Sequence, residues 1–199
     1  MKQKKIDDSA RAVLDNIRQR RTLPFTRMKP DPIAEEDLAL ILEAANWAPT
    51  HKFTEPWRFF LFEKAGRAVL GQLLGRTYTQ TAGALFNQNK FDKTVQRPEL
   101  VPLTVAVIMR PSSKVILPEF EELLAVGCAA QNLLLAAHSL KIGCSWSTPN
   151  YLDHPNIKEF FGLDERDRCL GFIYMGYPQG EWPTSKRCPI EDKVTKIQG

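Results

Sequence analysis

The longest apolar segment of the chain runs from Leu123 to Leu140 and falls inside a helix predicted from about Pro118 to Leu140. Its length raises the possibility of a membrane span, but the polar residues Gln131, Asn132 and His138 interrupt it. A helix that is apolar nearly all round is typical of the buried centre of a globular protein. The sequence therefore predicts a domain packed around this helix and no membrane partner.

Several shorter segments have the character of β-strands. Val101 to Met109 is a continuous apolar run rich in β-branched residues, which indicates a buried central strand. Trp57 to Phe62 and Arg168 to Met175 predict two more strands, and Cys144 to Thr148 a short strand or loop. Because helical segments alternate with these few strands, the pattern favours an α+β domain with a central sheet covered by helices.

Other segments predict the covering helices. Ser9 can cap a first helix, whose apolar residues recur at i, i+3, i+4 and i+7. A second helix begins near Glu35 and ends at Ala48, because a residue before proline resists helical geometry. Gly143 is expected to end the long helix, and residues 65–100 form a mostly helical stretch that could be a mobile flap over a site. The apolar residues of the first helix are Ala10, Val13, Leu14 and Ile17.

Composition excludes some classes of protein. With 199 residues the chain predicts one domain, residues 1–199, with a core large enough to need no metal or disulfide. The net charge of +4 is dispersed, which argues against a nucleic-acid partner. The four cysteines include no C-x-x-C pair, so no metal site is expected, and their sparseness suits a reducing compartment. Ile6-Asp7-Asp8-Ser9 stands where a secretory signal would be apolar, so the predicted location is cytoplasmic.

Two basic clusters are the first candidates for a site. Arg20-Arg21-Thr22 follows the first helix, and Lys186-Arg187 lies near the end of the chain. Two guanidinium groups with a hydroxyl can clamp a phosphate by paired hydrogen bonds, although surface charges and helix-end charges fit the same residues. His51, in a loop between two prolines, is the one histidine placed to touch a ligand. Dinucleotide and phosphate loops, hydrolase motifs and metal spacings are absent from the sequence, so any redox chemistry would come from a bound cofactor.

The order of these motifs resembles the nitroreductase family of FMN enzymes. Arg20-Arg21-Thr22 is similar to the R-R-S/T that opens the family's flavin site, and residues 48–57, APTHKFTEPW, to its A-P-x-x-x-x-x-Q-P-W segment. Residues 127–137 are similar to the core dimer helix, and 140–148 to the loop beside the flavin ring. Residues 171–178 and 186–189 are similar to the last core strand and the late basic residues.

The resemblance implies a nitroreductase-like fold with a mostly antiparallel sheet. It also implies a homodimer with FMN at the interface, and a C-terminal arm of about 179–199 extending over the partner. Arg20, Arg21 and Thr22 would hold the phosphate with Lys186 and Arg187. Trp47 and His51 would reach the flavin from the other subunit. Main-chain groups of Trp146, Ser147 and Thr148 would lie near its reactive edge. No protein side chain is expected to be catalytic.

The implied activity is transfer of a hydride from NADH or NADPH, through the flavin, to a nitroaromatic, quinone or similar small acceptor by ping-pong turnover. Glu55 stands where the family commonly has glutamine, and Trp47 where a related subgroup often has arginine, which bears on the choice of substrate. Other hypotheses remain open on the sequence. They are the same fold with reductive removal of a substituent or flavin breakdown, a non-catalytic flavin-binding sensor, and a basic binding module without flavin.

Overall fold

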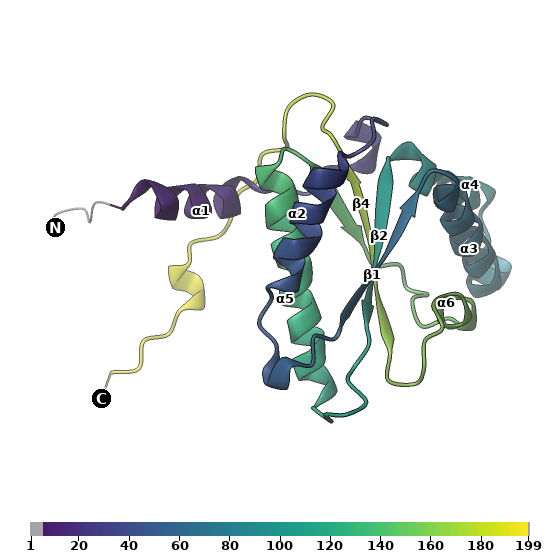
Figure 1. The fold of residues 1–199 in the computed structure, drawn as a ribbon. Helices are drawn as coiled ribbons and strands as arrows, with labels where there is room; N and C mark the ends of the chain where they lie inside the picture. Colours follow the sequence, from purple (N-terminus) through teal and green to yellow (C-terminus); the bar gives the residue numbers. More distant parts are fainter. Residues whose placement is uncertain (1–5, 199) are drawn as a thin grey trace.

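A sheet between two helical layers forms the body of the protein (Figure 1). The structure is a computed structural model that describes residues 6–198; Met1 to Lys5 and Gly199 lie outside the described residues. The strands are β1 (Trp57–Glu63), β2 (Leu103–Met109), β3 (Gly143–Ser147) and β4 (Arg168–Gly176). The α-helices are α1 (Asp8–Gln19), α2 (Glu35–Asn46), α3 (Ala65–Ala82), α4 (Gln88–Gln96), α5 (Glu119–Ser139) and α6 (Pro155–Phe161). Short 3-10 turns are η1 (Phe25–Arg27), η2 (His51–Phe53), η3 (Gly83–Leu85), η4 (Arg97–Leu100) and η5 (Glu191–Lys193).

The four strands pair in the order β1-β2-β4-β3, and every pairing is antiparallel. This confirms the α+β prediction with its antiparallel sheet. The segment predicted as a short strand or loop is the edge strand β3, which pairs with β4 from Gly143 opposite Gly176 to Ser147 opposite Phe172. β2 is central and fully buried, as its apolar run predicts.

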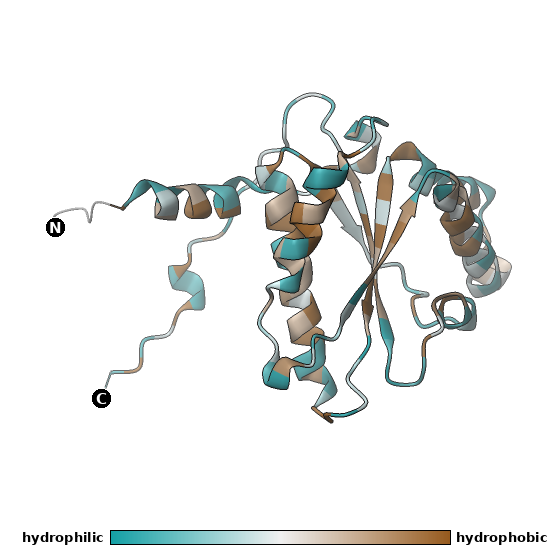
Figure 2. Cartoon of the chain, viewed as in Figure 1, coloured by the Kyte–Doolittle hydropathy of each residue, from teal (hydrophilic) through white to brown (hydrophobic). Residues whose placement is uncertain are grey.

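Side chains of β2 alternate between two hydrophobic cores, because successive residues of a strand point to opposite faces. Val105 and Val107 pack with α2 and α5, whereas Ala106 and Ile108 pack with α3 and α6. A strand buried on both faces must be apolar throughout, which explains the continuous run in the sequence. Figure 2 shows these brown strands enclosed between the helical layers.

Three local predictions were wrong. Asp7, not Ser9, caps α1: its carboxylate accepts the N–H of Ala10 at 2.8 Å, and Ser9 donates to that carboxylate. The residue with left-handed backbone after α5 is Lys141, not Gly143. Residues 65–100 are not a flap, because buried side chains of α3 pack against the sheet as a second core layer. Those buried side chains are Leu70, Leu73, Leu74 and Tyr78.

Two segments project from the body beyond α2 and α5 (Figure 1). One is α1, whose predicted apolar stripe is present but unburied, with Ile17 49% exposed. The other is the arm after β4, an extended chain that carries exposed apolar residues such as Ile190 and Ile197. No residue of α1 is buried, and the apolar residues of the arm after Pro183 are all exposed.

Candidate functional site

The Arg20-Arg21-Thr22 segment lies against the start of the edge strand β3. Thr22 forms a parallel β-bridge with Cys144, and the N–H of Leu23 donates to the Cys144 carbonyl at 2.9 Å. The two chains approach so closely that a Cβ on Gly143 would lie 2.2 Å from the Leu23 side chain. A glycine is therefore required where the basic segment meets the sheet.

Arg21 lines a cavity of about 420 Å³ at the C-terminal end of α5. Its guanidinium donates to the carbonyls of Arg18 at 2.5 Å and Arg20 at 2.7 Å, which caps the end of α1 as the helix-end interpretation predicts. Its Nε, however, is buried without a hydrogen-bond partner among residues 6–198. A buried donor left unpaired costs free energy, so the position of this arginine is not explained by its hydrogen bonds alone. The cavity is lined by Gln19, Arg21, His138, Lys141, Trp182, Pro183, Thr184 and Ser185.

Lys141 is a second cation of this cavity, and the sequence analysis missed it. It follows α5 with φ of 62°, a left-handed conformation that costs energy for any residue with a Cβ. It is also a common way for a helix to end, since the N–H groups of Ile142 and Lys141 donate to the carbonyls of Ala137 at 2.8 Å and His138 at 3.0 Å. A single lysine after a helix carries no recognisable signal in the sequence, so only the structure could show that it lies beside Arg21.

The pKa of His138 is affected by its burial and by the positive charge of this region. Burial lowers the pKa of His138, and the charges of Lys141, Arg20 and Arg21 lower it further. Its Nδ1 lies 2.7 Å from Oδ1 of Asn16, whose amide nitrogen donates to the Leu135 carbonyl, so Nδ1 of the neutral ring is the donor. His138 is thus a buried residue with its hydrogen-bonding satisfied at Nδ1, next to the cations of this cavity.

Replacement of His138 by glutamine is expected to reduce the loss in free energy of unfolding that the protein shows when the pH falls below about 6.5. Because the folded pKa lies below the ordinary value of 6.5, the stability that His138 contributes is complete above about pH 6.5 and is lost as the pH falls below it. Urea unfolding at pH 7.5 and 5.5 measures this. An equal loss of stability in both proteins on acidification would contradict the assignment.

The arm begins beside the same cavity. Its start is held by an antiparallel bridge between Met28 and Pro178, and Trp182 then packs edge-on against His138 at 4.8 Å between ring centroids. Lys186 and Arg187 follow Ser185, which lines the cavity, and both are exposed. The fold therefore brings the two basic clusters, one near each end of the chain, to the same side of the molecule. The Arg187 guanidinium itself bonds locally, to Ser185 Oγ at 2.5 Å and the Lys186 carbonyl at 3.0 Å.

Trp146 and Ser147 lie in the edge strand β3, and Thr148 follows it at the surface. The Trp146 indole donates to the Leu170 carbonyl at 2.9 Å and so lies across β4. Gly171 permits this, because a Cβ there would meet the Ser147 carbonyl at 2.4 Å and the indole nitrogen at 3.0 Å. The basic cavity and these three residues lie along the same edge strand.

Trp47 and His51 lie elsewhere: Trp47 lines a separate cavity of about 490 Å³ after α2, and His51 belongs to the loop whose residues Thr50 and Phe53 also line it. Trp47 is 79% exposed and donates to a carboxylate oxygen of Glu43 at 2.8 Å, whereas His51 Nδ1 lies 2.6 Å from Oε2 of Glu121. Glu55 is exposed in the wall of this cavity. The cavity is lined by Asn46, Trp47, Ala48, Pro49, Thr50, Phe53, Glu55 and Trp57.

The length of α5 separates the two halves of the predicted site. His51 contacts Glu121 at the beginning of this helix, and the basic cavity contains His138 at its end. At ~1.5 Å per residue, Glu121 and His138 are about 25 Å apart. One copy of the chain therefore does not bring His51 to Arg21, and the predicted set divides into two groups at opposite ends of α5.

The fold and the order of these features match a known family. The family model described as Nitroreductase family matches residues 17–177. The chain belongs to the nitroreductase family. The matched range begins in α1 and ends just after β4, so it includes both groups of candidate residues except those of the arm.

Relatives of this nitroreductase are similar to it in sequence or structure over most of its length. The chain is 33% identical over 162 residues to YdjA of Escherichia coli K12, named as an NAD(P)H nitroreductase, a match covering 81% of this chain and 86% of that protein. The structure of a nitroreductase-like family protein from Bacillus cereus superposes with a TM-score of 0.79 at 25% identity, covering 94% and 96% of the two chains. A protein from Desulfovibrio desulfuricans, solved in complex with FMN, has a TM-score of 0.69 at 24% identity, covering 94% and 96%.

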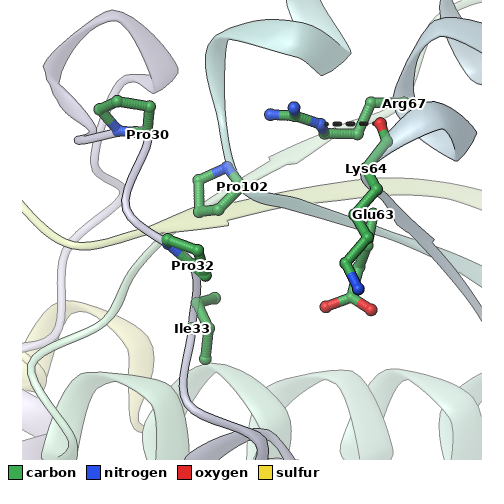
Figure 3. Close-up of a pocket in the computed structure, with 7 residues that line it drawn as sticks. All are labelled: Pro30, Pro32, Ile33, Glu63, Lys64, Arg67 and Pro102. Carbon is green, nitrogen blue, oxygen red and sulfur yellow. Dashed lines mark hydrogen bonds between the residues drawn. The ribbon is translucent and has the colours of Figure 1, made fainter.

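Two other features of this nitroreductase, a buried thiol and a small cavity near β1, are accounted for by their surroundings. Burial raises the pKa of Cys144 to about 12, so its thiol is no nucleophile at neutral pH. A cavity of about 110 Å³ lies between prolines and basic residues near β1 (Figure 3). Its cation Arg67 is already engaged, because it donates to the Val101 carbonyl at 2.9 Å and the Lys64 carbonyl at 3.2 Å. In residues 6–198 no cluster of side chains has the composition of a metal site.

Proposed function

We propose that this chain is an FMN-dependent NAD(P)H oxidoreductase. The observation that carries the proposal is the positively charged cavity at the end of α5, beside the edge strand β3. A phosphate group suits this cavity, because its lining includes Arg21, Lys141 and the hydroxyl-bearing residues Thr184 and Ser185. The name of YdjA and the FMN-bound structure support the same cofactor and electron donor.

In this proposal the basic residues of one copy hold the phosphate of FMN. Arg20, Arg21 and Thr22 act from the end of α1, and Lys186 and Arg187 from the arm. Trp146, Ser147 and Thr148 lie beside the ring system, where the edge of β3 offers main-chain hydrogen-bonding groups. An amide directed at the ring stabilises negative charge that develops on reduction.

The site is completed by a second copy of the chain in a C2 homodimer. Phe120 and Leu124 are exposed on α5 at helical spacing, and Leu124 is 64% exposed. A Cβ at Gly127, one turn further on, would meet nothing within 4 Å, which leaves room for a helix from another copy to approach. Antiparallel packing of two α5 helices would bring Trp47 and His51 of one copy to the basic cavity of the other.

FMN, when bound, accepts a hydride from the nicotinamide and passes it to the acceptor. We propose ping-pong turnover, in which NAD(P)H gives up its hydride and leaves as NAD(P)+ before a nitroaromatic, quinone or similar flat, electron-poor acceptor binds. The exposed rings of Trp47 and Phe53 offer stacking surfaces for such molecules. Side chains of the protein bind and orient the reactants, and solvent supplies the protons.

The remaining features agree with a single FMN-binding domain, residues 1–199, located in the cytoplasm. The arm of about 179–199 would extend over the partner subunit and bury its apolar residues there. α5 is long and apolar enough to cross a membrane, but it packs on the sheet and on α2, which is typical of a core helix. The four cysteines are free, as in a reducing compartment.

The purified protein is expected to be yellow and to lose its flavin absorption when NADH or NADPH is added without oxygen. Absorption near 450 nm, about where oxidised flavins absorb, is recorded before and after each addition, and then after addition of a nitroaromatic or quinone. Recovery of the band with the acceptor supports turnover. A flavin band that neither nicotinamide bleaches would indicate a flavin-binding sensor, and a protein that takes up no FMN would refute the proposal.

A further inference from the structure

The loop after α2 has an unusual concentration of strained backbone. Lys52, Phe53 and Glu55 all have positive φ, at 49°, 55° and 44°. Residues with a Cβ disfavour this region, and the surrounding structure must impose it. This loop carries His51 and forms the wall of the cavity next to Trp47.

A chain of hydrogen bonds ties the strained loop to one buried carboxylate. Thr54 Oγ1 donates to Oε2 of Glu122 at 2.7 Å, and therefore Thr50 Oγ1 is the donor in its 3.1 Å contact with Thr54 Oγ1. Thr50 Oγ1 in turn accepts the N–H of Glu55 at 3.2 Å. All the protons in this chain point toward Glu122, so the carboxylate fixes the direction of every bond.

Burial of Glu122 lowers the stability of the folded state. Its side chain belongs to a residue that is only 2% exposed, and its Oε1 has no hydrogen-bond partner among residues 6–198. A buried carboxylate with one unpaired oxygen destabilises the folded state relative to an apolar residue of similar size. Stability therefore does not account for this residue.

We propose that Glu122 is a positioning residue, which holds residues 50–55 in the strained conformation that presents His51 and the cavity wall formed by Phe53 and Glu55 to the cofactor of the second copy. The neighbouring Glu121 adds a second bond from α5 to the loop, at His51 Nδ1. The inference rests on the proposed function, because it assigns the loop to the flavin site. It differs from a purely structural role in predicting that stability and activity change in opposite directions.

The test compares Glu122→Leu with Glu122→Gln and with a matched control, Thr104→Val. Thr104 is also fully buried with an unpaired oxygen, but it lies in β2 away from the loop. Melting temperature and amide hydrogen exchange are measured on the protein without cofactor. The Michaelis constant for the acceptor and the turnover number are measured with FMN bound.

We expect Glu122→Leu to keep or raise the melting temperature, while exchange at residues 53–55 becomes about tenfold faster and kcat/KM falls about tenfold. Glu122→Gln is expected to keep loop exchange and kcat/KM near their wild-type values, because its side-chain carbonyl can accept the Thr54 proton. Thr104→Val is expected to raise the melting temperature and leave exchange in the loop and kinetics unchanged.

Unchanged loop exchange in Glu122→Leu would overturn the inference, whatever happens to the melting temperature. Faster loop exchange in Glu122→Leu together with normal kinetics would do the same. A wild-type protein without flavin or nicotinamide oxidation would instead refute the proposed function, and the exchange data would still test the hydrogen-bond chain.

Discussion

Replacement of Leu124 by glutamate is expected to produce a monomer that no longer retains FMN. Leu124 lies in the exposed apolar stripe of α5, which the second copy would cover. Burial of an unpaired carboxylate costs several kcal/mol, so the dissociation constant of the dimer should rise by at least about 100-fold. Sedimentation velocity at micromolar concentration measures the mass, and flavin absorption measures the bound cofactor in the same sample.

The matched control is Val69→Glu. Val69 is also an exposed apolar residue of a helix, but it lies in α3 on the opposite face of the sheet. This variant should remain dimeric and yellow. A Leu124→Glu protein that stays dimeric would contradict the placement of α5 at the interface, and a yellow monomer would show that one copy binds FMN alone.

Replacement of Arg20 by alanine is expected to weaken FMN binding by about 10- to 100-fold without changing the mass of the dimer. Hydrogen bonds to a charged group are worth about 1.5–3 kcal/mol, and each ~1.4 kcal/mol corresponds to a factor of ten. Burial is the main influence on the pKa of His138, which it lowers, and of Cys144, which it raises, and Arg20 lies close enough to both for its charge to act on each as a smaller, lowering influence. Fluorescence titration of the apoprotein with FMN measures the affinity.

Arg18→Ala provides the comparison on the same helix. Arg18 is an exposed arginine that forms a 3.7 Å ion pair with Asp15, and its carbonyl continues to accept from Arg21 after substitution. Its FMN affinity should remain within about twofold of the wild type, because a distant exposed charge is screened. Equal losses in the two variants would indicate a general effect of positive charge and would refute a specific phosphate clamp.

The architecture was predictable because burial leaves a periodic record in the sequence. The unbroken apolar run at Val101 to Met109 requires a strand covered on both faces, and the mixed polarity of the first helix requires one buried stripe. That stripe also shows the limit of the argument. Periodicity predicts that Val13 and Ile17 are covered, yet both are exposed in the structure, and the pattern does not identify what would cover them.

Details that depend on tertiary packing escaped prediction. Ser9 and Asp7 are both favourable N-cap residues, and only the structure shows that Asp7 is the one that caps α1. Residues 65–100 show little hydrophobic periodicity, so their sequence does not reveal that α3 and α4 form a layer packed on the sheet instead of a flap. Lys141 joins the basic cavity through the path of the chain after α5, and Glu122 reaches Thr54 across the loop; neither contact follows from spacing.

The separation of the two residue groups by the length of α5 has a genetic consequence. In the proposed dimer each site takes its phosphate clamp from one subunit and its aromatic loop from the other. A subunit damaged at the clamp and a subunit damaged at the loop would pair to give one site with both lesions and one site with neither. Two inactive alleles of this gene should therefore complement each other in the same cell, whereas two alleles damaged at the same end of α5 should not.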